Sequence, residues 1–432
     1  MKRKLLFLER VLYGNGSQPF HGVFSVKITG NLNPENFTCA LQKLQTKYPP
    51  LTYGIEENEK AEPFFVTQNP APEISLRIMK RDSDLDWIHE TTTELGTSFD
   101  VKTGPLLRVV WLRSKHVSDI ILAFHHCLCD GGSGMVILTD LLAVLDNTTT
   151  DIGTSSTFNS MADLIPKEIL TSRKKKFKAA FSAGLVNTAL AVMSRFISVK
   201  NKVVFQRERD YLINWKLSAE QSSALFAVCK KKQVTVNTAL CLAFLEAFRM
   251  VNGESAHGKA TCPVDIRRYM PEIKKDTIFS FGLALNMQLD KKSGVDFWAN
   301  AKKQQFAVSS QMAKLDPYEF IMTMEKSHPS IRHLIKFLTY AKAGNDFMFS
   351  NMGKLDIAAD YGTFSIETIY SPTVVGPFGN PTTIITTTFN RQMDFSFVCN
   401  ESYMARKTVL EIKDQAMKLL FSNVTVESGI KV

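Results

Sequence analysis

A pair of histidines followed by an aspartate carries the clearest chemical signal in the sequence. The run Ile120 to Phe124 is apolar throughout, which predicts a strand buried on both faces. His125 and His126 follow it directly, and Asp130 comes shortly afterwards. The apolar positions between Met135 and Leu145 predict a helix. The histidines therefore lie where a buried strand ends and a helix begins.

An imidazole held at such a strand end is suited to general-base chemistry. Near pH 7 a neutral ring can accept the proton of an attacking hydroxyl or amine and return it to a departing group. Successive side chains of a strand point to opposite faces, so His125 and His126 cannot both face one cavity, and one of them is structural. Asp130 is placed either to cap the following helix or to pair with an arginine from elsewhere, and we assign it to architecture.

Other interpretations of this segment are weaker. A packed or solvated histidine pair is the ordinary alternative, and the Asp-Gly at the following turn is what favours catalysis over it. A metal site built from the histidines and Asp130 is disfavoured, because adjacent histidines diverge and no third histidine or carboxylate stands at helical spacing. Cys127 and Cys129 are expected to be small buried residues rather than nucleophiles, and Ser133 is expected to start the helix.

Length and composition indicate a globular protein. A chain of 432 residues with 44% hydrophobic and 22% charged residues allows two or three domains. The apolar segment after the basic N-terminus is too short for a signal peptide, because Glu9 and Arg10 interrupt it. The seven cysteines are odd in number and scattered, so they do not form a disulfide framework. We expect a reduced, cytoplasmic, monomeric protein, with peripheral membrane attachment left open.

The net charge of +10 is concentrated in one segment. Residues 165–210 hold eleven Lys or Arg and three Asp or Glu, a local net charge of +8. An acidic carrier protein, the phosphates of a coenzyme A thioester or an anionic membrane surface would be attracted to this segment. Nucleic acid is not an expected partner, because no binding motif or ladder of aromatic residues accompanies the charge.

The chain divides into three parts. Residues 1–155 predict an α/β lobe that carries the histidine loop. The residues of 146–160 are small and polar and show no periodicity, so we place the boundary of the first lobe in this stretch. Residues 156–205 are expected to form a linker and a crossover segment. Residues 206–432 return to an α/β pattern and predict a second lobe.

Short sequence patterns predict the positions of several strands and helices. Residues 22–28 alternate like a strand, and the residues after Asn33 predict a helix that ends before Pro49. In the second lobe, Ser218 opens a helix with a capping box, and Thr235 opens the next apolar helix.

The middle part contains an apolar segment next to a basic cluster. The cluster covers residues 173–178, and the apolar segment runs from Ala179 to Val199. Its length approaches that of a membrane span, but Asn187, Thr188 and Arg195 argue against spanning. Two interpretations stay open. We favour a crossover helix packed on the protein with a solvated basic face over a helix lying in a membrane interface with the cluster on lipid headgroups.

The order His-His-x-x-x-Asp-Gly resembles the signature of an acyl-transferring superfamily. This superfamily includes chloramphenicol acetyltransferase, the condensation domains of nonribosomal peptide synthetases, and the alcohol and polyketide-associated acyltransferases. The resemblance implies that His126 is the general base. It also implies that His125, Asp130 and Gly131 are structural residues of the site.

Further matches extend the resemblance to nearly the whole chain outside residues 150–205. Val264-Asp265-x-Arg267 looks like the family's Val-Asp-x-Arg segment, in which the arginine pairs with the motif aspartate. The resemblance therefore implies an ion pair between Arg267 and Asp130 that ties two lobes together. Arg268 is expected on the surface.

Three polar residues are candidates for stabilising an oxyanion or lining a tunnel, namely Ser350, Asn351 and Asn286. Ser350-Asn351-x-Gly353 is similar to the Ser-Asn-x-Gly of the alcohol and polyketide-associated acyltransferases, and donors fixed beside a developing oxyanion lower the barrier. A turn at the end of a strand is an equal alternative for Asn351. The stretch after Ile384 resembles a strand lining the channel, although the family often has glycine where Arg391 stands.

The implied fold is α/β, with two chloramphenicol-acetyltransferase-like lobes, each a mixed sheet flanked by helices, arranged as a V with the active site at their interface. The implied reaction transfers an acyl group from acyl-coenzyme A or a phosphopantetheinyl carrier protein to a small-molecule hydroxyl, with no bound cofactor and no metal. Two alternatives stay open. One is an amide-forming condensation enzyme with an amine acceptor, and the other is a non-catalytic module that binds a carrier protein or a membrane through residues 165–210.

Overall fold

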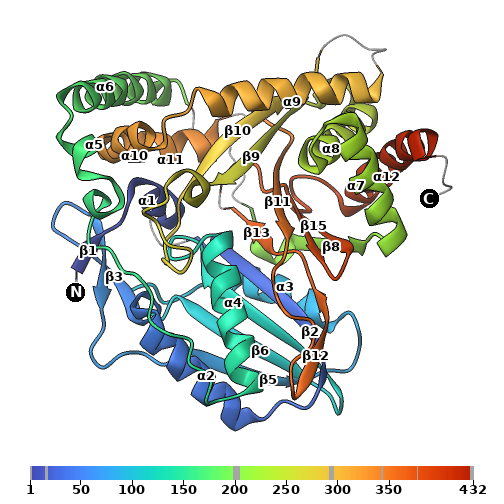
Figure 1. Ribbon diagram of the computed structural model, residues 1–432. Helices are drawn as coiled ribbons and strands as arrows, with labels where there is room; N and C mark the ends of the chain where they lie inside the picture. Colours follow the sequence, from blue (N-terminus) through green and yellow to red (C-terminus); the bar gives the residue numbers. More distant parts are fainter. Residues whose placement is uncertain are drawn as a thin grey trace.

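Two large β-sheets organise the chain, which a computed structural model describes over residues 2–14, 18–197, 205–290, 296–341, 344–376 and 378–428 (Figure 1). The first sheet has the strand order β12-β2-β7-β6-β5, with β13 also paired to β2. The second has the order β10-β9-β11-β14-β15-β8, and a small sheet has the order β1-β4-β3. Helices flank both large sheets, as the sequence predicts for a mixed α/β fold.

The strands are β1 (Lys2–Lys4), β2 (His21–Gly30), β3 (Tyr53–Glu57), β4 (Pro63–Thr67), β5 (Ser75–Lys80), β6 (Leu107–Arg113), β7 (Val117–His125), β8 (Asp210–Lys216), β9 (Lys259–Asp265), β10 (Gly282–Gln288), β11 (Phe347–Lys354), β12 (Phe364–Ile369), β13 (Thr373–Val375), β14 (Thr383–Phe389) and β15 (Gln392–Asn400). The α-helices are α1 (Phe7–Tyr13), α2 (Pro34–Lys47), α3 (Asp86–Gly96), α4 (Gly131–Asp146), α5 (Lys167–Thr171), α6 (Arg173–Arg195), α7 (Ala219–Lys232), α8 (Val236–Asn252), α9 (Phe297–Ala313), α10 (Pro317–Lys326), α11 (Ile331–Tyr340) and α12 (Arg406–Ser428).

The first sheet is covered on both faces. Helices α2 and α4 pack on one face through a core that includes Phe37, Leu141 and the inward side chains of β7. Helix α3 lies on the other face, where Trp87 packs with residues of β2, β6 and β7 and with Leu212 of β8. Because α3 contacts strands of both large sheets, it joins the two halves of the molecule.

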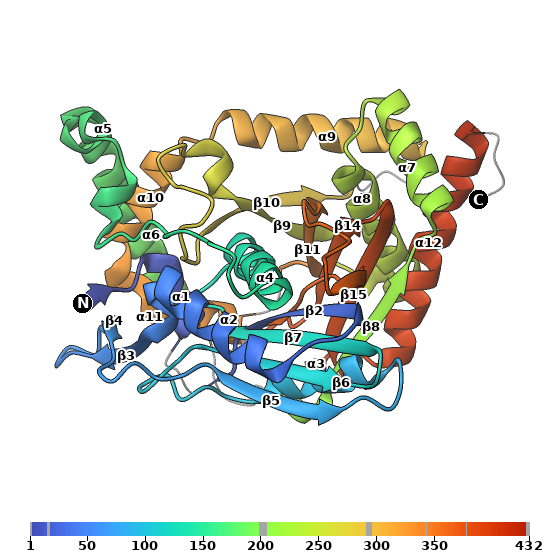
Figure 2. The ribbon, with the colours of Figure 1, turned by 60° about the horizontal axis from the view of Figure 1, so that its bottom comes forward.

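The second sheet carries its own core. Helices α7, α8, α9 and α12 contribute to a buried cluster that includes Phe244, Phe248, Phe347, Phe395 and Phe397. Helix α8 is buried along most of its length, which explains its apolar sequence. Figure 2 shows α4 between the two sheets, with β9 and β10 on one side and β2 and β7 on the other.

Several elements predicted from the sequence are confirmed. The predicted strand at 22–28 lies within β2, and α2 begins at an Asn33 N-cap and ends at Lys47. Ser218 and Gln221 form the predicted capping box of α7, and Thr235 caps α8.

The second half of the chain also supplies strands to the first sheet. β12 and β13 pair antiparallel with β2, so residues 364–375 return to the lobe that the sequence divides off at residue 155. The assignment of 1–155, 156–205 and 206–432 as lobe, linker and lobe stays a prediction. Residues 198–204 of the predicted linker lie outside the described residues.

Helix α6 lies at the edge of the molecule against α10 and α11 (Figures 1 and 2). The helix packs on the protein, as the favoured crossover interpretation expects, whereas the choice between solvent and lipid for its outer face stays a prediction. Residues 198 and 199 of the predicted apolar segment lie outside the described residues. Among the described helices, α6 alone is by itself long and apolar enough to cross a membrane by length and composition. The pair α7 and α8 passes the same test only jointly, across a bend of 102°.

Candidate functional site

The histidine loop connects β7 to α4. His125 is the last residue of β7, and Asp130 is the N-cap of α4. The backbone N–H of His125 donates to Leu106 O at 2.9 Å, and that of His126 donates to Phe20 O at 2.8 Å. The neighbouring strands therefore fix the backbone of both histidines, as the sequence predicts for the end of a buried strand.

His126 is held in one tautomer by its own loop. Its Nδ1 lies 3.0 Å from the carbonyl oxygen of Cys129, so Nδ1 carries the proton and donates it. Nε2 is then an unprotonated acceptor, and no described residue hydrogen-bonds to it. The ring is partly exposed and packs edge-on against Phe20 and Phe124. A free, part-exposed Nε2 is what a general base requires.

Burial tunes the basicity of this ring. Desolvation lowers the pKa of His126 below its ordinary value of 6.5, and the hydrogen bond to Cys129 and the charge of Asp130 oppose that effect in part. If His126 is the base, the acid limb of a kcat/KM profile should have its midpoint below pH 6.5, because only the neutral ring accepts a proton. A pH series of initial rates measures this, and a midpoint above 6.5 would exclude the assignment.

His125 points into the protein interior instead. The side chain is buried, and its Nδ1 accepts a hydrogen bond from Cys127 N at 3.3 Å, which places the ring proton on Nε2. It lies opposite His21 in the β2–β7 ladder, with ring centroids 5.7 Å apart. His21 is also buried, and its Nδ1 donates to Glu94 O at 3.0 Å. Nothing in the sequence signals His21 as a neighbour of the loop.

These two buried imidazoles should make stability depend on pH. Burial lowers the pKa of His125 to about 3 and that of His21 well below 6.5. The unfolded chain binds protons as the pH falls below about 6.5, whereas the folded chain does not, so the free energy of unfolding should fall between pH 6.5 and about 3. Urea unfolding across this range checks the slope. A His21→Phe variant should show a smaller slope than wild type, and the exposed control His89→Phe should show none of this reduction.

Asp130 performs both architectural tasks that the sequence leaves open. Its carboxylate accepts from Ser133 N at 2.9 Å, which caps α4, and from Nη1 of Arg267 at 2.8 Å. Nη2 of Arg267 donates to Ser133 Oγ at 2.8 Å and to Thr277 O at 3.1 Å. Ser133 Oγ in turn donates to Phe279 O at 3.1 Å. The implied ion pair is present and ties the histidine loop to residues 267–279 of the second half.

Further side chains contact Arg267 where the histidine loop meets residues 267–279. Asp265 accepts from Nη1 of Arg267 at 3.2 Å, and the Arg267 guanidinium lies 4.3 Å from the Phe279 ring. Arg268 is exposed, as expected. A Cβ at Gly131 would come within 3.1 Å of Sδ and Cε of Met352, so a larger residue there would require the end of the Met352 side chain to move.

The cysteines of the loop are not suited to nucleophilic attack. Cys127 and Cys129 are both buried, and desolvation raises the pKa of each thiol well above its ordinary value. The thiol rather than the thiolate is therefore the stable form at neutral pH. Within the described residues, no group of three or more His, Cys, Asp or Glu side chains could hold a metal ion.

The turn that the sequence leaves as an alternative for Asn351 is a bulge within strand β11. β11 continues to Lys354 and carries a bulge between Asn351 and Gly353, in which Met352 is the extra residue. Asn351 Oδ1 accepts from Gly353 N at 2.8 Å, so the side chain stabilises the bulge. Its Nδ2 and the Ser350 hydroxyl have no hydrogen-bond partner among the described residues. Both can still donate, and their assignment to an oxyanion stays a prediction.

Asn286 lies apart from the histidine loop. It is exposed on β10, where its Oδ1 accepts from Thr261 Oγ1 at 3.2 Å and its backbone bonds to the side chain of Gln311. It lines a surface pocket of about 420 Å³ together with residues of α9. None of the lining residues belongs to the loop, so this position gives the oxyanion assignment no support.

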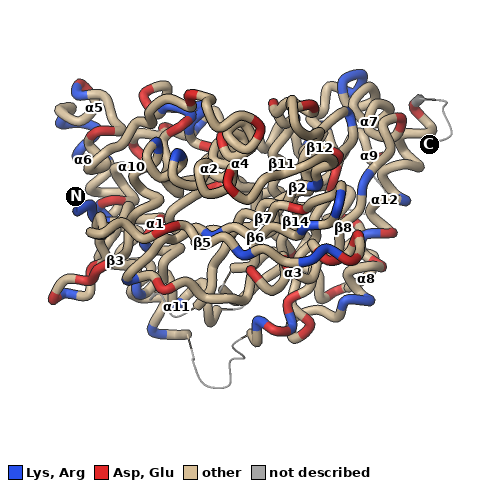
Figure 3. Tube along the Cα trace, turned by 90° about the horizontal axis from the view of Figure 1, so that it is seen from below, with Lys and Arg blue, Asp and Glu red and all other residues tan. Residues whose placement is uncertain are grey.

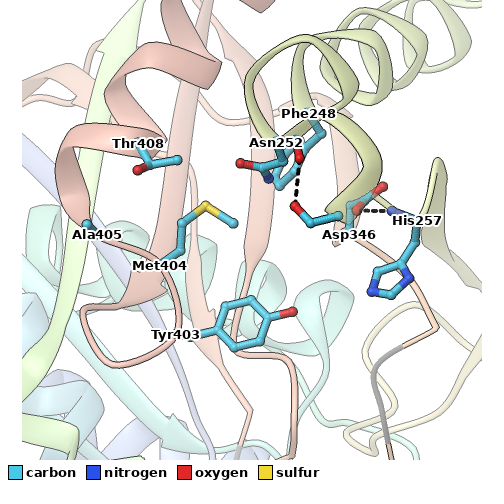
Figure 4. A pocket seen from close by; sticks show the side chains of 9 residues that line it. Phe248, Asn252, His257, Asp346, Tyr403, Met404, Ala405 and Thr408 are labelled. Atoms are coloured by element: carbon cyan, nitrogen blue, oxygen red, sulfur yellow. Dashed lines mark hydrogen bonds between the residues drawn. The ribbon is translucent and has the colours of Figure 1, made fainter.

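A second surface pocket, of about 370 Å³, is lined by residues of α8, the loop before α12 and Asp346 (Figure 4). Asp346 accepts from the backbone N–H groups of His257 at 2.7 Å and Lys259 at 3.2 Å, which stabilises the chain entering β9. Tyr403 and Met404 close the other side. No residue of the histidine loop lines this pocket either.

Residues 3–261 match the protein-family model of the Condensation domain. The match covers more than half of the chain, includes the histidine loop and Asp130, and ends within β9, before Arg267. The chain belongs to the condensation-domain family.

Solved structures of similar fold cover nearly the whole chain. The first condensation domain of the CDA synthetase superposes with a TM-score of 0.71 at 12% identity, covering 97% of this chain and 95% of that one. The TRI3 trichothecene 15-O-acetyltransferase from Fusarium sporotrichioides superposes with a TM-score of 0.73 at 12% identity, covering 97% and 94%. The epimerization domain of tyrocidine synthetase B gives 0.69 at 13% identity, covering 98% and 96%. These likenesses establish the two-lobed fold.

A relative among characterised proteins is much longer. Nonribosomal peptide synthetase kk1B of Curvularia clavata is 28% identical over 139 residues, which are 32% of this chain and 1% of that protein. This condensation-domain chain therefore corresponds to a small part of that synthetase.

Proposed function

We propose that this protein is an acyltransferase that moves an acyl group from a coenzyme A or carrier-protein thioester to a small-molecule hydroxyl. The observation that carries the proposal is the His126 ring, with Nδ1–H donated to Cys129 O and Nε2 free and partly exposed. A base fixed in this tautomer can accept a proton without reorienting. The rigid backbone of the loop keeps the ring in place while two substrates bind.

The reaction proceeds without an acyl-enzyme. Nε2 of His126 accepts the proton of the acceptor hydroxyl while its oxygen attacks the thioester carbonyl carbon. The tetrahedral intermediate collapses with cleavage of the C–S bond, and Nε2–H returns the proton to the departing thiolate sulfur. The products are an ester and a free thiol. Ser350 and Asn351 are the donors proposed for the intermediate's oxyanion.

The release of free thiol tests this function directly. The purified chain is incubated with a mixture of acyl-coenzyme A thioesters and candidate alcohols, and the new thiol is followed with a colorimetric reagent. Acceptor-dependent thiol release that is lost in a His126→Ala variant supports the proposal. No acceptor-dependent release from any donor, including carrier-bound ones, would overturn it and favour a non-catalytic module.

Amide formation is the second candidate, and the similarity to a nonribosomal peptide synthetase favours it. In that case an amine replaces the hydroxyl, and the donor is an acyl group on a phosphopantetheinyl carrier protein. The same assay distinguishes the two, because amine acceptors with carrier-bound donors should then give faster thiol release than alcohols. Mass spectrometry of the product identifies the ester or the amide.

A further inference from the structure

Helix α6 has an apolar row on its outer side. Phe177, Phe181 and Leu185 follow one another at four-residue spacing and are 73%, 60% and 58% exposed. Val192 and Phe196 continue the same side and are exposed as well. At a rise of about 1.5 Å per residue the row is about 28 Å long. Large exposed apolar residues that gather on one face mark an interaction site.

The inner side of the same helix is fixed to the protein. Ala179 and Ala183 are buried against α10 and α11, which small side chains allow to come close. Lys175 pairs with Asp316, the N-cap of α10, at 3.0 Å, and Lys178 pairs with Glu319 of α10 at 2.7 Å.

The other end of α6 is tied to α11. Ser194 Oγ lies 2.8 Å from Nδ1 of His333, and Lys336 donates to Ser194 O at 2.8 Å. Both ends of α6 are thus attached along the protein surface. The helix can lie in a membrane interface but cannot leave the protein to span a bilayer without breaking these contacts.

The residues around the apolar row carry a net positive charge, and acidic side chains neutralise only part of it. Residues 167–196 hold seven Lys or Arg and a single acid, Glu168. Whereas Lys175 and Lys178 are paired, Arg173, Lys174 and Lys176 are exposed and form no ion pair with the described residues. Figure 3 shows Lys and Arg along α5 and α6 at one end of the molecule. This charge is complementary to an anionic surface.

We propose that the outer face of α6 docks on an anionic lipid bilayer, with Phe177, Phe181 and Leu185 in the interface and the unpaired cations Arg173 and Lys174 on the headgroups. An apolar row rich in Phe and Leu, flanked by Lys and Arg, is the pattern of an interfacial helix. A second copy of the chain fits less well, because it would bring like charges together. A protein partner would need concave complementarity, whereas the row lies on a convex helix at the edge of the fold.

Vesicle flotation with the full chain tests the proposal. Wild type should float with vesicles of phosphatidylcholine mixed with phosphatidylserine, and weakly with phosphatidylcholine alone. A triple variant Phe177→Ser, Phe181→Ser and Leu185→Ser should bind the anionic vesicles at least tenfold more weakly with an unchanged melting temperature. The matched control replaces Leu85, Met250 and Phe306 with Ser, residues that are 60%, 63% and 76% exposed on other elements, and it should bind like wild type.

A second variant tests the contribution of the basic residues to membrane binding. Arg173→Glu with Lys174→Glu should weaken binding to anionic vesicles by on the order of tenfold or more and leave binding to phosphatidylcholine unchanged, since basic residues near an anionic surface add to the attraction. Equal flotation of wild type and the triple variant, or equal loss in the control, would overturn the proposal. So would a wild-type dimer in sedimentation that the triple variant converts to monomer without any vesicle binding. None of these readouts depends on acyl transfer.

Discussion

Replacing His126 with alanine should lower acyl transfer by about 10²- to 10⁴-fold, the usual contribution of a positioned general base. The ring is partly exposed, and its one hydrogen bond within the loop is to Cys129 O, so the fold should tolerate the change. Acceptor-dependent thiol release measures the activity, and circular dichroism melting measures the fold.

The control for this variant is His89→Ala, which removes an exposed imidazole from α3. It should leave both the rate and the melting temperature unchanged. If His126→Ala retained near-normal activity with a native melting curve, another group would have to be the base.

Replacing Asp130 with alanine should instead destabilise the protein. The carboxylate caps α4 and pairs with the buried Arg267 guanidinium, which would be left without its partner from the loop. Removing one partner of a buried ion pair costs about 3–5 kcal/mol. Urea unfolding of wild type and Asp130→Ala measures the difference, and a double variant with Arg267→Met should recover part of the loss.

The Lys175–Asp316 pair provides the matched control, because both of its side chains are about one-third exposed. Asp316→Ala also removes a helix cap, so Lys175→Ala is the cleaner change, and it should cost about 0–1 kcal/mol. If Asp130→Ala abolished activity at unchanged stability, Asp130 would act in the chemistry and our structural assignment would be wrong.

The sequence predicts those parts of the site that depend on local patterns of neighbouring residues. A buried apolar strand, a helix start and the spacing between them place His125, His126 and Asp130 correctly. The resemblance adds Arg267, and the contact is present. The catalytic role of His126 stays a prediction, which the thiol-release assay tests.

What the sequence does not predict depends on long-range pairing. The packing of His21 beside His125 arises from the β2–β7 register. The bulge at Met352 arises from the β11–β14 pairing, and the sequence alone leaves a turn at Asn351 as an equal alternative. Asn390 and Arg391 adopt positive φ of 45° and 65° in the hairpin between β14 and β15, so an arginine takes the left-handed conformation that glycine favours.

Residues 364–375 return to the first sheet, and this pairing affects both the stability of truncated fragments and the rate of folding. β2 pairs with β7 on one edge, and its other edge is filled by β12 and β13. A fragment that ends near residue 261 would lack those strands and expose the backbone of β2, which invites intermolecular pairing and aggregation. During synthesis the first sheet can close only after most of the chain has left the ribosome, so contacts of high sequence separation should make folding slow.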